Sequence, residues 1–298
     1  MSKAEAEVAS LLRASWRDYY ELTKPRVVML IVFTAVVGML LAVPGVPPLD
    51  LVVFGTLGIG LASASAAAVN QIIDARVDAQ MRRTQNRPLV QGHLNDRQAL
   101  TFAGALCVSG ISLLWLLVNP LTAVLTFLSL VGYAVVYTVY LKPATPQNIV
   151  IGGAAGAAPP VLGWAAITGE VHAYSLLLFL IIFVWTPPHF WALAIARRDE
   201  YAKVGTPMLP VTHGVRYTKL SVLLYTILLV IVTLLPWLSG MSGLLYLAAA
   251  MFFGGVFLRH ALLLRASDGD ESAMPMFVYS INYLMYLFAA LLLDHYLL

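Results

Sequence analysis

The chain has 298 residues, of which 60% are hydrophobic and only 11% are charged, and its formal net charge is +3. Its mean hydropathy of +0.83 is far from that of a water-soluble globular domain and indicates that its main solvent is lipid. This composition excludes a soluble enzyme, and the small basic excess has a topological explanation, so it does not indicate nucleic-acid binding.

An apolar run of about 20 residues can cross a bilayer as a helix, because a helix satisfies its own backbone hydrogen bonds. The sequence contains nine such runs, separated by polar residues, glycine or proline. The break between the third and fourth runs rests on Asn119 and Pro120 alone. In chain order, the predicted spans are 27–43, 51–72, 99–118, 121–141, 149–168, 174–196, 220–238, 243–264 and 277–293.

The 18 lysines and arginines all fall on one side of this arrangement. They precede the first span, follow the second, fourth and sixth, or lie at the end of the eighth. The alternate loops and the C-terminus carry none. Because loops rich in Lys and Arg stay in the cytoplasm, this pattern predicts a cytoplasmic N-terminus and a C-terminus outside. Merging the third and fourth runs would destroy the segregation, which supports the break at Asn119.

We therefore predict an all-α integral membrane protein whose residues 1–298 form a single membrane domain. Residues 1–26 form a cytoplasmic segment, and residues 27–298 a bundle of nine transmembrane helices with its active site on the cytoplasmic side. The N-terminal residues lack the early apolar core of a secretory signal, which favours a multi-pass protein of the bacterial plasma (inner) membrane. On this interpretation the lipid bilayer is one of its partners, and no nucleic acid is expected among them.

The first dense group of polar residues follows the second span. Asn70, Asp74 and Asp78 recur at four-residue steps, which on a helix places them on one stripe, rising ~6 Å per step. Carboxylate oxygens, completed by waters and substrate phosphates, are what Mg²⁺ prefers, and arginines can hold phosphate oxygens. The alternative is that the carboxylates only pair with arginines at the membrane surface. The small residues at 62–68 favour a packed site.

A second group follows the sixth span, on the same predicted face. Asp199 and Glu200 lie there among Arg197, Tyr201 and Lys203. Two acidic motifs at one end of a bundle predict a site for a Mg²⁺-bound diphosphate at the mouth of an apolar interior. An allylic diphosphate suits such a site, because the apolar interior would shield its carbocation from water.

The motifs around both loops resemble those of a known family. Residues 70–78 (NQIIDARVD), with MRRT at 81–84 and NRPL at 86–89, resemble the first aspartate motif of UbiA-type intramembrane prenyltransferases. Within that family the chain is most similar to the branch that farnesylates haem. The other matching stretches are LTKPR at 22–26, YT at 137–138, LK at 141–142, TPQNIVIGG at 145–153, PP at 159–160, GW at 163–164, WTPPHFWAL at 185–193, DEY at 199–201 and PMLP at 207–210.

The resemblance implies transfer of a farnesyl group from farnesyl diphosphate to a vinyl group of haem b (protohaem IX), with water addition, giving haem O and diphosphate. Mg²⁺ is the implied cofactor, and haem b is a substrate. A haem A synthase or the assembly machinery of a terminal oxidase is the protein partner that such a product implies. Lys203 stands where the wider family commonly has a second carboxylate, so one metal ion and two both remain open.

The resemblance also assigns roles to particular residues. The implied metal ligands are Asn70, Asp74, Asp78 and Asp199. The implied catalytic residues are Asp74, Asp78, Asp199, Glu200, Tyr201 and Lys203. The implied substrate contacts are Asn70, Arg76, Arg82, Arg83, Asn86, Arg87, Lys142, His189 and Arg197.

His189 favours haem over a quinone-type acceptor. It lies ten residues before Asp199, or ~15 Å deeper on a helix. The alternative is that it satisfies carbonyls freed by Pro187 and Pro188.

Two other functions fit parts of the pattern. A prenyltransferase for an aromatic quinone precursor would share the diphosphate site. A secondary transporter would also have many spans and polar groups inside the membrane, but its charged residues should lie near the bilayer midplane. Here the carboxylates crowd one end of the spans, which favours an enzyme.

Overall fold

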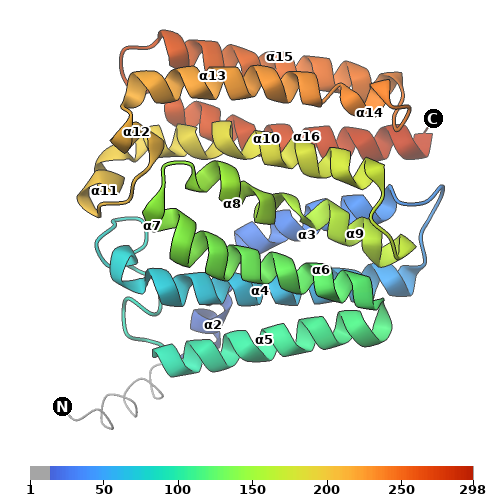
Figure 1. Ribbon diagram of the computed structural model, residues 1–298, viewed down its shortest axis with the longest axis horizontal. Coiled ribbons are helices and arrows are strands. Elements are labelled where there is room, and N and C mark those ends of the chain that lie inside the picture. Colours follow the sequence, from blue (N-terminus) through green and yellow to red (C-terminus); the bar gives the residue numbers. More distant parts are fainter. Residues whose placement is uncertain (1–13, 298) are drawn as a thin grey trace.

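The computed structural model describes residues 14–297, and these residues form helices and loops without a strand (Figure 1). Of the predicted cytoplasmic segment 1–26, residues 1–13 lie outside the described residues. The N-terminal half contains α2 (Trp16–Leu22), α3 (Pro25–Leu40), α4 (Leu49–Asp78), α5 (Asp96–Leu117), α6 (Pro120–Val131), the π-helix η1 (Gly132–Leu141), α7 (Lys142–Ala144) and α8 (Asn148–Ala157). The remainder contains α9 (Pro159–Thr168), α10 (Ala173–Ala196), α11 (Arg198–Lys203), α12 (Leu209–Thr212), α13 (Val215–Val232), α14 (Leu235–Leu238), α15 (Leu244–Ala266) and α16 (Ala273–Leu297).

Eight helical segments of residues 14–297 are long and apolar enough to cross a membrane, and a ninth is counted if α2 and α3 form one bent span. The two helices meet at an angle of 54°, and α3 corresponds to the predicted first span. The predicted break between the third and fourth spans is confirmed. The side chain of Asn119 accepts a hydrogen bond from the amide of Thr122 at 2.8 Å, which caps the start of α6.

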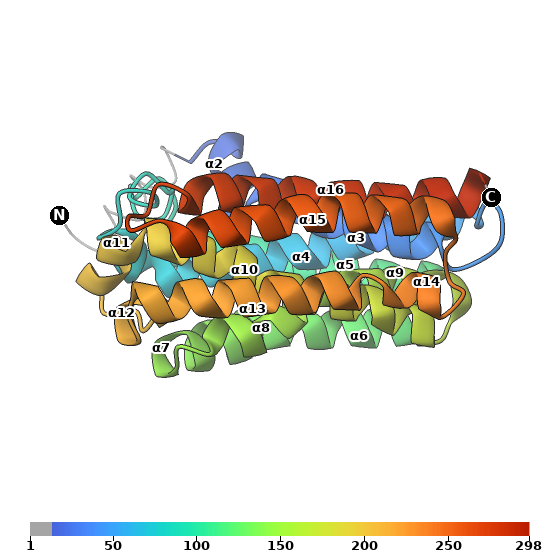
Figure 2. The same ribbon diagram turned by 90° about the horizontal axis from the view of Figure 1, so that it is seen from above.

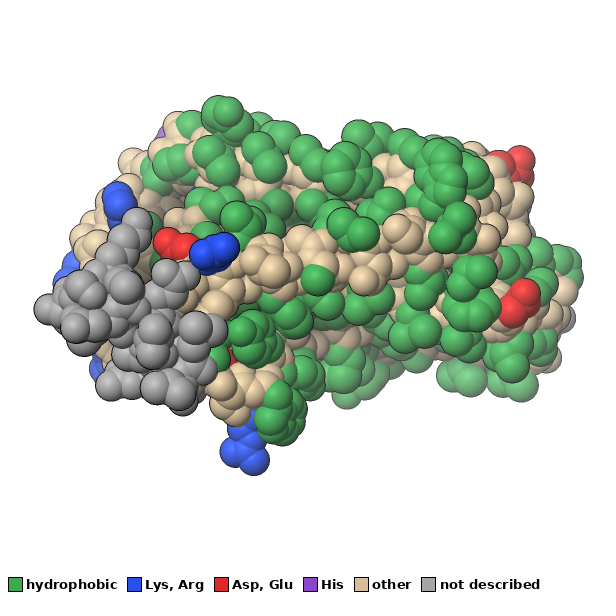
Figure 3. Space-filling model, turned by 90° about the horizontal axis from the view of Figure 1, so that it is seen from below, with side chains coloured by type: hydrophobic (Ala, Val, Ile, Leu, Met, Phe, Trp, Pro, Cys, Tyr) green, Lys and Arg blue, Asp and Glu red, His purple; other side chains and the backbone are tan. Residues whose placement is uncertain are grey.

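The long helices run side by side along the longest axis, and the short helices α7, α11 and α12 gather at one end (Figures 1 and 2). Hydrophobic side chains cover the long sides of the visible face, and Lys and Arg side chains gather toward that same end (Figure 3). This distribution suits a bundle with lipid around its flanks and a polar site at one end.

Close backbone contact fixes α3 against α9. A Cβ atom on Gly163 would lie 1.9 Å from the carbonyl oxygen of Ala35, and one on Gly38 would lie 2.2 Å from that of Pro160. Only glycine allows two helices to approach so closely, and such contacts are a main source of helix association in lipid. The contact also holds α3 beside the helix pair α8–α9, which forms one span interrupted at Ala158.

The final helix, α16, closes the bundle. It packs against α15 and α10 and also reaches α3. Near its end, the hydroxyl of Tyr296 donates to the carbonyl oxygen of Leu40 at 3.0 Å. Elements far apart in the sequence are therefore neighbours, and α10 and α16 lie side by side in both views (Figures 1 and 2).

Candidate active site

The three residues of the first motif lie on one buried stripe at the end of α4, as their spacing predicts. Asn70, Asp74 and Asp78 are 3%, 7% and 5% exposed. The amide of Asn70 donates to Oδ2 of Asp74 at 3.0 Å, so the two side chains form one polar unit. A helix that continues to Asp78, beyond the apolar part of the span, brings these oxygens together.

Each member of the motif contacts a basic side chain from a different part of the chain. Lys142, at the start of α7, places Nζ 2.6 Å from Oδ2 of Asp74. Arg87 forms an ion pair with Oδ2 of Asp78, and Lys24 donates to Oδ1 of Asn70. The Oδ1 atoms of both aspartates make no hydrogen bond within residues 14–297. Two carboxylate oxygens thus remain available to a further ligand.

Lys24 also belongs to the site, although no specific role was predicted for it. It is the N-cap of α3, and it is the one non-glycine residue with positive φ (51°) in the described chain. Such a conformation costs about 1–2 kcal/mol. Gln71 fixes the preceding turn by donating to the carbonyl oxygens of Glu21 and Leu22 at 3.1 and 3.0 Å.

Burial, more than neighbouring charges, shifts the pKa of Lys24. Desolvation lowers the pKa of Lys24 to about 7, with Arg87 and Lys142 acting in the same direction, whereas Asp74 and Asp78 raise it. The signal that pointed to this residue was the LTKPR stretch at 22–26, which matched the family without indicating which of its side chains enters the site.

The π-helix η1 supplies a second wall of the site. Thr138 accepts from the amide of Asn70 at 3.1 Å and donates to the carbonyl oxygen of Tyr133 at 2.8 Å. The rings of Tyr133 and Tyr137 stack at 5.6 Å with an interplanar angle of 18°. Pi-helical turns are frequent at functional sites, and this one connects the Asn70 contact to Lys142, the residue that follows it.

Of the second motif, Tyr201 lies near the first motif, whereas Asp199 points to solvent. Tyr201 is buried, and burial raises the pKa of its hydroxyl. The charges of Glu200 and Asp74 raise this pKa further, and those of Arg83 and Arg197 lower it. Since Asp74 and Arg83 belong to the first motif and its loop, the two motifs lie at the same end of the bundle and near each other.

The carboxylates of the second motif have local partners. The side chain of Asp199 is 89% exposed and pairs with Arg198 at 3.1 Å, and Glu200 pairs with Arg197 at 2.9 Å. Within residues 14–297, no three His, Cys, Asp or Glu side chains are grouped so that they could hold a metal ion. The structure therefore does not bring Asp199 to the first motif, and its role as a metal ligand stays a prediction.

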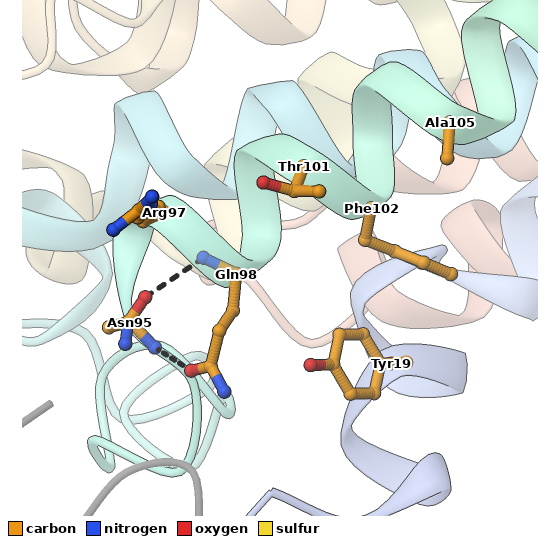
Figure 4. Close-up of a pocket in the computed structure, with 7 residues that line it drawn as sticks. All are labelled: Tyr19, Asn95, Arg97, Gln98, Thr101, Phe102 and Ala105. Carbon is orange, nitrogen blue, oxygen red and sulfur yellow. Dashed lines mark hydrogen bonds between the residues drawn. The ribbon is translucent and has the colours of Figure 1, made fainter. Parts of the chain in front are cut away.

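The other predicted residues of these loops lie at the same end of the molecule but are exposed: Arg76, Arg82, Arg83, Asn86 and Lys203. A pocket of about 230 Å³ lies at the second motif, where residues 195–200 face Asp270. A larger pocket of about 400 Å³ lies between α2 and α5, lined by residues that include Tyr19 and Phe102 (Figure 4). None of the predicted site residues lines this larger pocket.

His189 is buried in α10, away from the charged end. Its Nδ1 atom lies 2.6 Å from the hydroxyl of Ser280 on α16. Its ring packs between those of Trp185 and Phe277, at centroid distances of 4.2 and 4.7 Å. Nδ1 thus contacts a hydroxyl and not a carbonyl oxygen. The structure does not show the alternative in which His189 satisfies carbonyls freed by Pro187 and Pro188.

Comparison with known proteins agrees with this geometry. Residues 31–282 match the UbiA prenyltransferase family. The chain is 62% identical to the protoheme IX farnesyltransferase of Methylococcus capsulatus over 95% of each chain. It is 60% identical to the protein of the same name from Nitrosococcus oceani, again over 95% of each chain.

Solved structures show the same fold at low sequence identity. A digeranylgeranylglyceryl phosphate synthase superposes with a TM-score of 0.79 at 18% identity, covering 95% of this chain and 99% of that one. A UbiA homologue from Archaeoglobus fulgidus bound to GPP and Mg²⁺ superposes with a TM-score of 0.65 at 17% identity, covering 92% and 99%. The arrangement of helices is thus that of intramembrane prenyltransferases.

Proposed function

The chain belongs to the UbiA prenyltransferase family, and from this premise we propose that it transfers the farnesyl group of farnesyl diphosphate to a vinyl group of haem b. Water adds in the same reaction, and the products are haem O and diphosphate. The names of relatives that are 60% and 62% identical support this choice of substrates. We place the protein in the bacterial inner membrane with the site at the cytoplasmic face, as the distribution of basic residues predicts.

The observation that carries the proposal is the group of basic side chains on the first motif. Lys24, Lys142 and Arg87 contact the motif from three separate elements. Three basic groups gathered around two carboxylates form a receptor for an additional anion. The diphosphate of a prenyl donor is such an anion, and its apolar tail suits the interior of the bundle.

The motif also fits a divalent metal. Asp74 and Asp78 each engage Oδ2 with a basic partner and retain Oδ1, and hard carboxylate oxygens are what Mg²⁺ prefers. The Mg²⁺-bound structure of a UbiA homologue supports the same choice. Bound there, Mg²⁺ would supply positive charge to the departing diphosphate. In our proposal Asn70, Asp74 and Asp78 hold it, and Asp199 joins them only if α11 turns inward.

The chain's own residues would then act on the substrates as follows. Lys24, Lys142 and Arg87 exchange their motif contacts for phosphate oxygens and stabilise the charge of the leaving group. The stacked rings of Tyr133 and Tyr137 adjoin the motif through Thr138 and are suited to cover a carbocation with their π faces. The apolar bundle keeps water from the cation until the vinyl carbon has reacted.

The direct test is to incubate the purified protein in detergent with haem b and farnesyl diphosphate, with and without Mg²⁺, and to follow the mass of the haem. The expected product is hydroxyethylfarnesyl haem that forms only with Mg²⁺. Release of diphosphate from farnesyl diphosphate with unchanged haem would retain the donor site and reject haem as the acceptor. Absence of both products from folded protein would reject the proposal.

Replacement of one motif carboxylate gives a sharper test. Asp74→Asn should lower turnover about 100- to 1,000-fold, the usual effect of removing one group that stabilises transition-state charge. Asp50→Asn is the matched control, because Asp50 is an exposed aspartate at the opposite end of the same helix. Near-normal turnover of the Asp74 variant, at an unchanged melting temperature, would remove the metal role.

A further inference from the structure

Lys219, near the start of α13, is a buried lysine that belongs to neither motif, and it is only 4% exposed. Its Nζ atom donates to the carbonyl oxygens of Ser267 and Gly269, at 2.8 and 2.7 Å, and lies 3.4 Å from the hydroxyl oxygen of Ser267. Within residues 14–297 no carboxylate pairs with it. The ammonium group thus serves one loop, residues 267–272, which joins α15 to α16.

The loop that Lys219 holds brings Asp270 to the second motif. Asp270 follows Gly269 and faces residues 195–200 across the pocket of about 230 Å³. Its carbonyl oxygen accepts from the amide of Ala273 at 3.0 Å, in the turn that leads into α16. Its carboxylate has no hydrogen-bond or ion-pair partner within residues 14–297. A side chain from a third loop therefore belongs to the wall of the second motif.

The charged groups of this pocket are unequal in number. Two arginines and three carboxylates line it: Arg197, Arg198, Asp199, Glu200 and Asp270. Arg197 pairs with Glu200, and Arg198 pairs with Asp199. One carboxylate is thus always without an arginine. In the structure it is Asp270, and a change of partner by Arg198 would make it Asp199.

The pair between Arg198 and Asp199 is suited to such an exchange. Nε and Nη2 of Arg198 both contact the same oxygen of Asp199 at 3.1 Å, and the aspartate side chain is 89% exposed. An ion pair in water adds little stability, so the guanidinium group can change partners at small cost. Asp270 lines the same pocket and offers a carboxylate without a partner.

We infer that Asp270 is a positioning residue for Asp199: it accepts Arg198 when α11 turns toward the first motif, and so frees the Asp199 carboxylate for the metal. The inference rests on the proposed function, since it names how the second motif joins the diphosphate site. Without this acceptor, an inward turn of Asp199 would leave the guanidinium group of Arg198 unpaired. Lys219 holds Asp270 in place while α11 moves.

The test follows Mn²⁺, a spectroscopic substitute for Mg²⁺, on the full-length protein with the donor analogue farnesyl thiodiphosphate and without haem. Electron paramagnetic resonance measures the free ion. Asp270→Asn should weaken Mn²⁺ binding about two- to fivefold, the change that loss of one exposed ion pair produces. Asp270→Glu retains the charge and should restore binding. Asp268→Asn is the matched control, because Asp268 is an exposed aspartate of the same loop that does not line the pocket.

A double-mutant cycle shows whether Asp270 acts through Arg198. Arg198→Gln leaves no guanidinium group to hold Asp199, so this variant should bind Mn²⁺ at least as tightly as the wild type. In that background Asp270→Asn should have no further effect. Equal losses with and without Arg198 would overturn the inference, because they would show that Asp270 contacts the metal or acts by its charge alone. Unchanged binding in Asp270→Asn would overturn it as well.

Lys219 is tested through the same cycle. Lys219→Met removes the ammonium group and releases the loop, so Mn²⁺ binding should weaken as in Asp270→Asn. Lys219→Arg retains the charge and should bind Mn²⁺ as the wild type does. The loss in Lys219→Met should disappear in the Arg198→Gln background, which a lysine that only stabilised the fold would not show. If Lys219→Met does not fold, the Asp270 cycle decides alone.

The outcomes keep this inference apart from the proposed function, because Mn²⁺ binding is measured without haem. A wild type that forms haem O, with unchanged Mn²⁺ binding in Asp270→Asn, overturns the role of Asp270 and leaves the reaction intact. The expected cycle in a protein that forms no haem O retains the role of Asp270 at a diphosphate site and rejects haem as the acceptor.

Discussion

Lys24 combines a costly backbone conformation with a contact at the centre of the site. Its positive φ directs the side chain to Asn70, and the following Pro25 starts α3. A residue before proline prefers extended backbone, so neither local propensity nor the neighbouring sequence favours the observed conformation. Strain of this kind at a ligand site persists because surrounding contacts hold it, here those of Gln71.

Replacement of Lys24 by glycine should separate the strain from the function. Glycine adopts positive φ without a steric cost, so the melting temperature of Lys24→Gly should equal or exceed that of the wild type. Loss of the ammonium group should weaken binding of farnesyl diphosphate roughly 10- to 100-fold, equivalent to about 1.5–3 kcal/mol for a charge-assisted hydrogen bond. Calorimetric titration with farnesyl diphosphate and Mg²⁺ measures this change.

Arg26→Gln is the control for that experiment, because Arg26 is an exposed basic residue two positions away. It should bind farnesyl diphosphate as the wild type does. Equal weakening in both variants would show that general positive charge, and not the contact of Lys24 with the motif, attracts the diphosphate.

Residue spacing predicted the stripe of the first motif but not its partners. Four-residue steps along one helix place Asn70, Asp74 and Asp78 on one side whatever the rest of the fold does. Lys24 and Lys142 reach that stripe across 46 and 68 residues of sequence. Such contacts depend on how α3 and η1 pack against α4, and residue spacing along one helix does not predict this packing.

At the scale of elements, α8 is the helix whose surface shapes the site. A Cβ atom on Gly152 would lie 2.2 Å from Cδ2 of Tyr137, so the ring of Tyr137 occupies the space that a side chain would need. On the same helix, a Cβ atom on Gly156 would meet nothing within 4 Å. The two glycines therefore offer a comparison within one element.

Gly152→Ala should displace the ring of Tyr137 and lower stability by about 1–3 kcal/mol, the typical cost of overpacking. Turnover should fall as well, because the stack with Tyr133 is lost. Gly156→Ala should leave turnover unchanged and add up to about 1 kcal/mol through helix propensity. Thermal unfolding and haem farnesylation are the two measurements, and equal effects of both substitutions would contradict the role given to Gly152.

Helix boundaries were predicted correctly where the residues at the boundary themselves determine it. Asn119 before Pro120 is a helix-start signal, and the break between spans follows from it. The π-helix was missed because residues 132–141 look like an ordinary apolar run, and its geometry accompanies the contact of Thr138 with Asn70. The bend before α3 was missed because Lys24 adopts a conformation that its sequence context disfavours.

For the whole molecule, the orientation in the membrane stays a prediction that the charge distribution makes and labelling can check. Cys107 is the single cysteine, so a Cys107→Ser background allows new cysteines at chosen loops. Val46→Cys, at a residue 84% exposed after α3, should react with an impermeant maleimide in intact cells. Arg82→Cys, exposed after α4, should react only after the membrane is permeabilised. The reverse pattern would invert the proposed topology.

The placement of Ser280 on α16 has a consequence for the order in which the site is made. Ribosomes synthesise helices in chain order, so the first motif and its partner Lys142 are complete well before the helix that orients His189. The roughly 140 residues between Lys142 and Ser280 take about 7 to 28 seconds to synthesise. During that interval a nascent chain has the residues of the first motif but lacks the hydroxyl that contacts Nδ1 of His189. The half of the bundle around α10 is therefore completed only when α16 has entered the membrane.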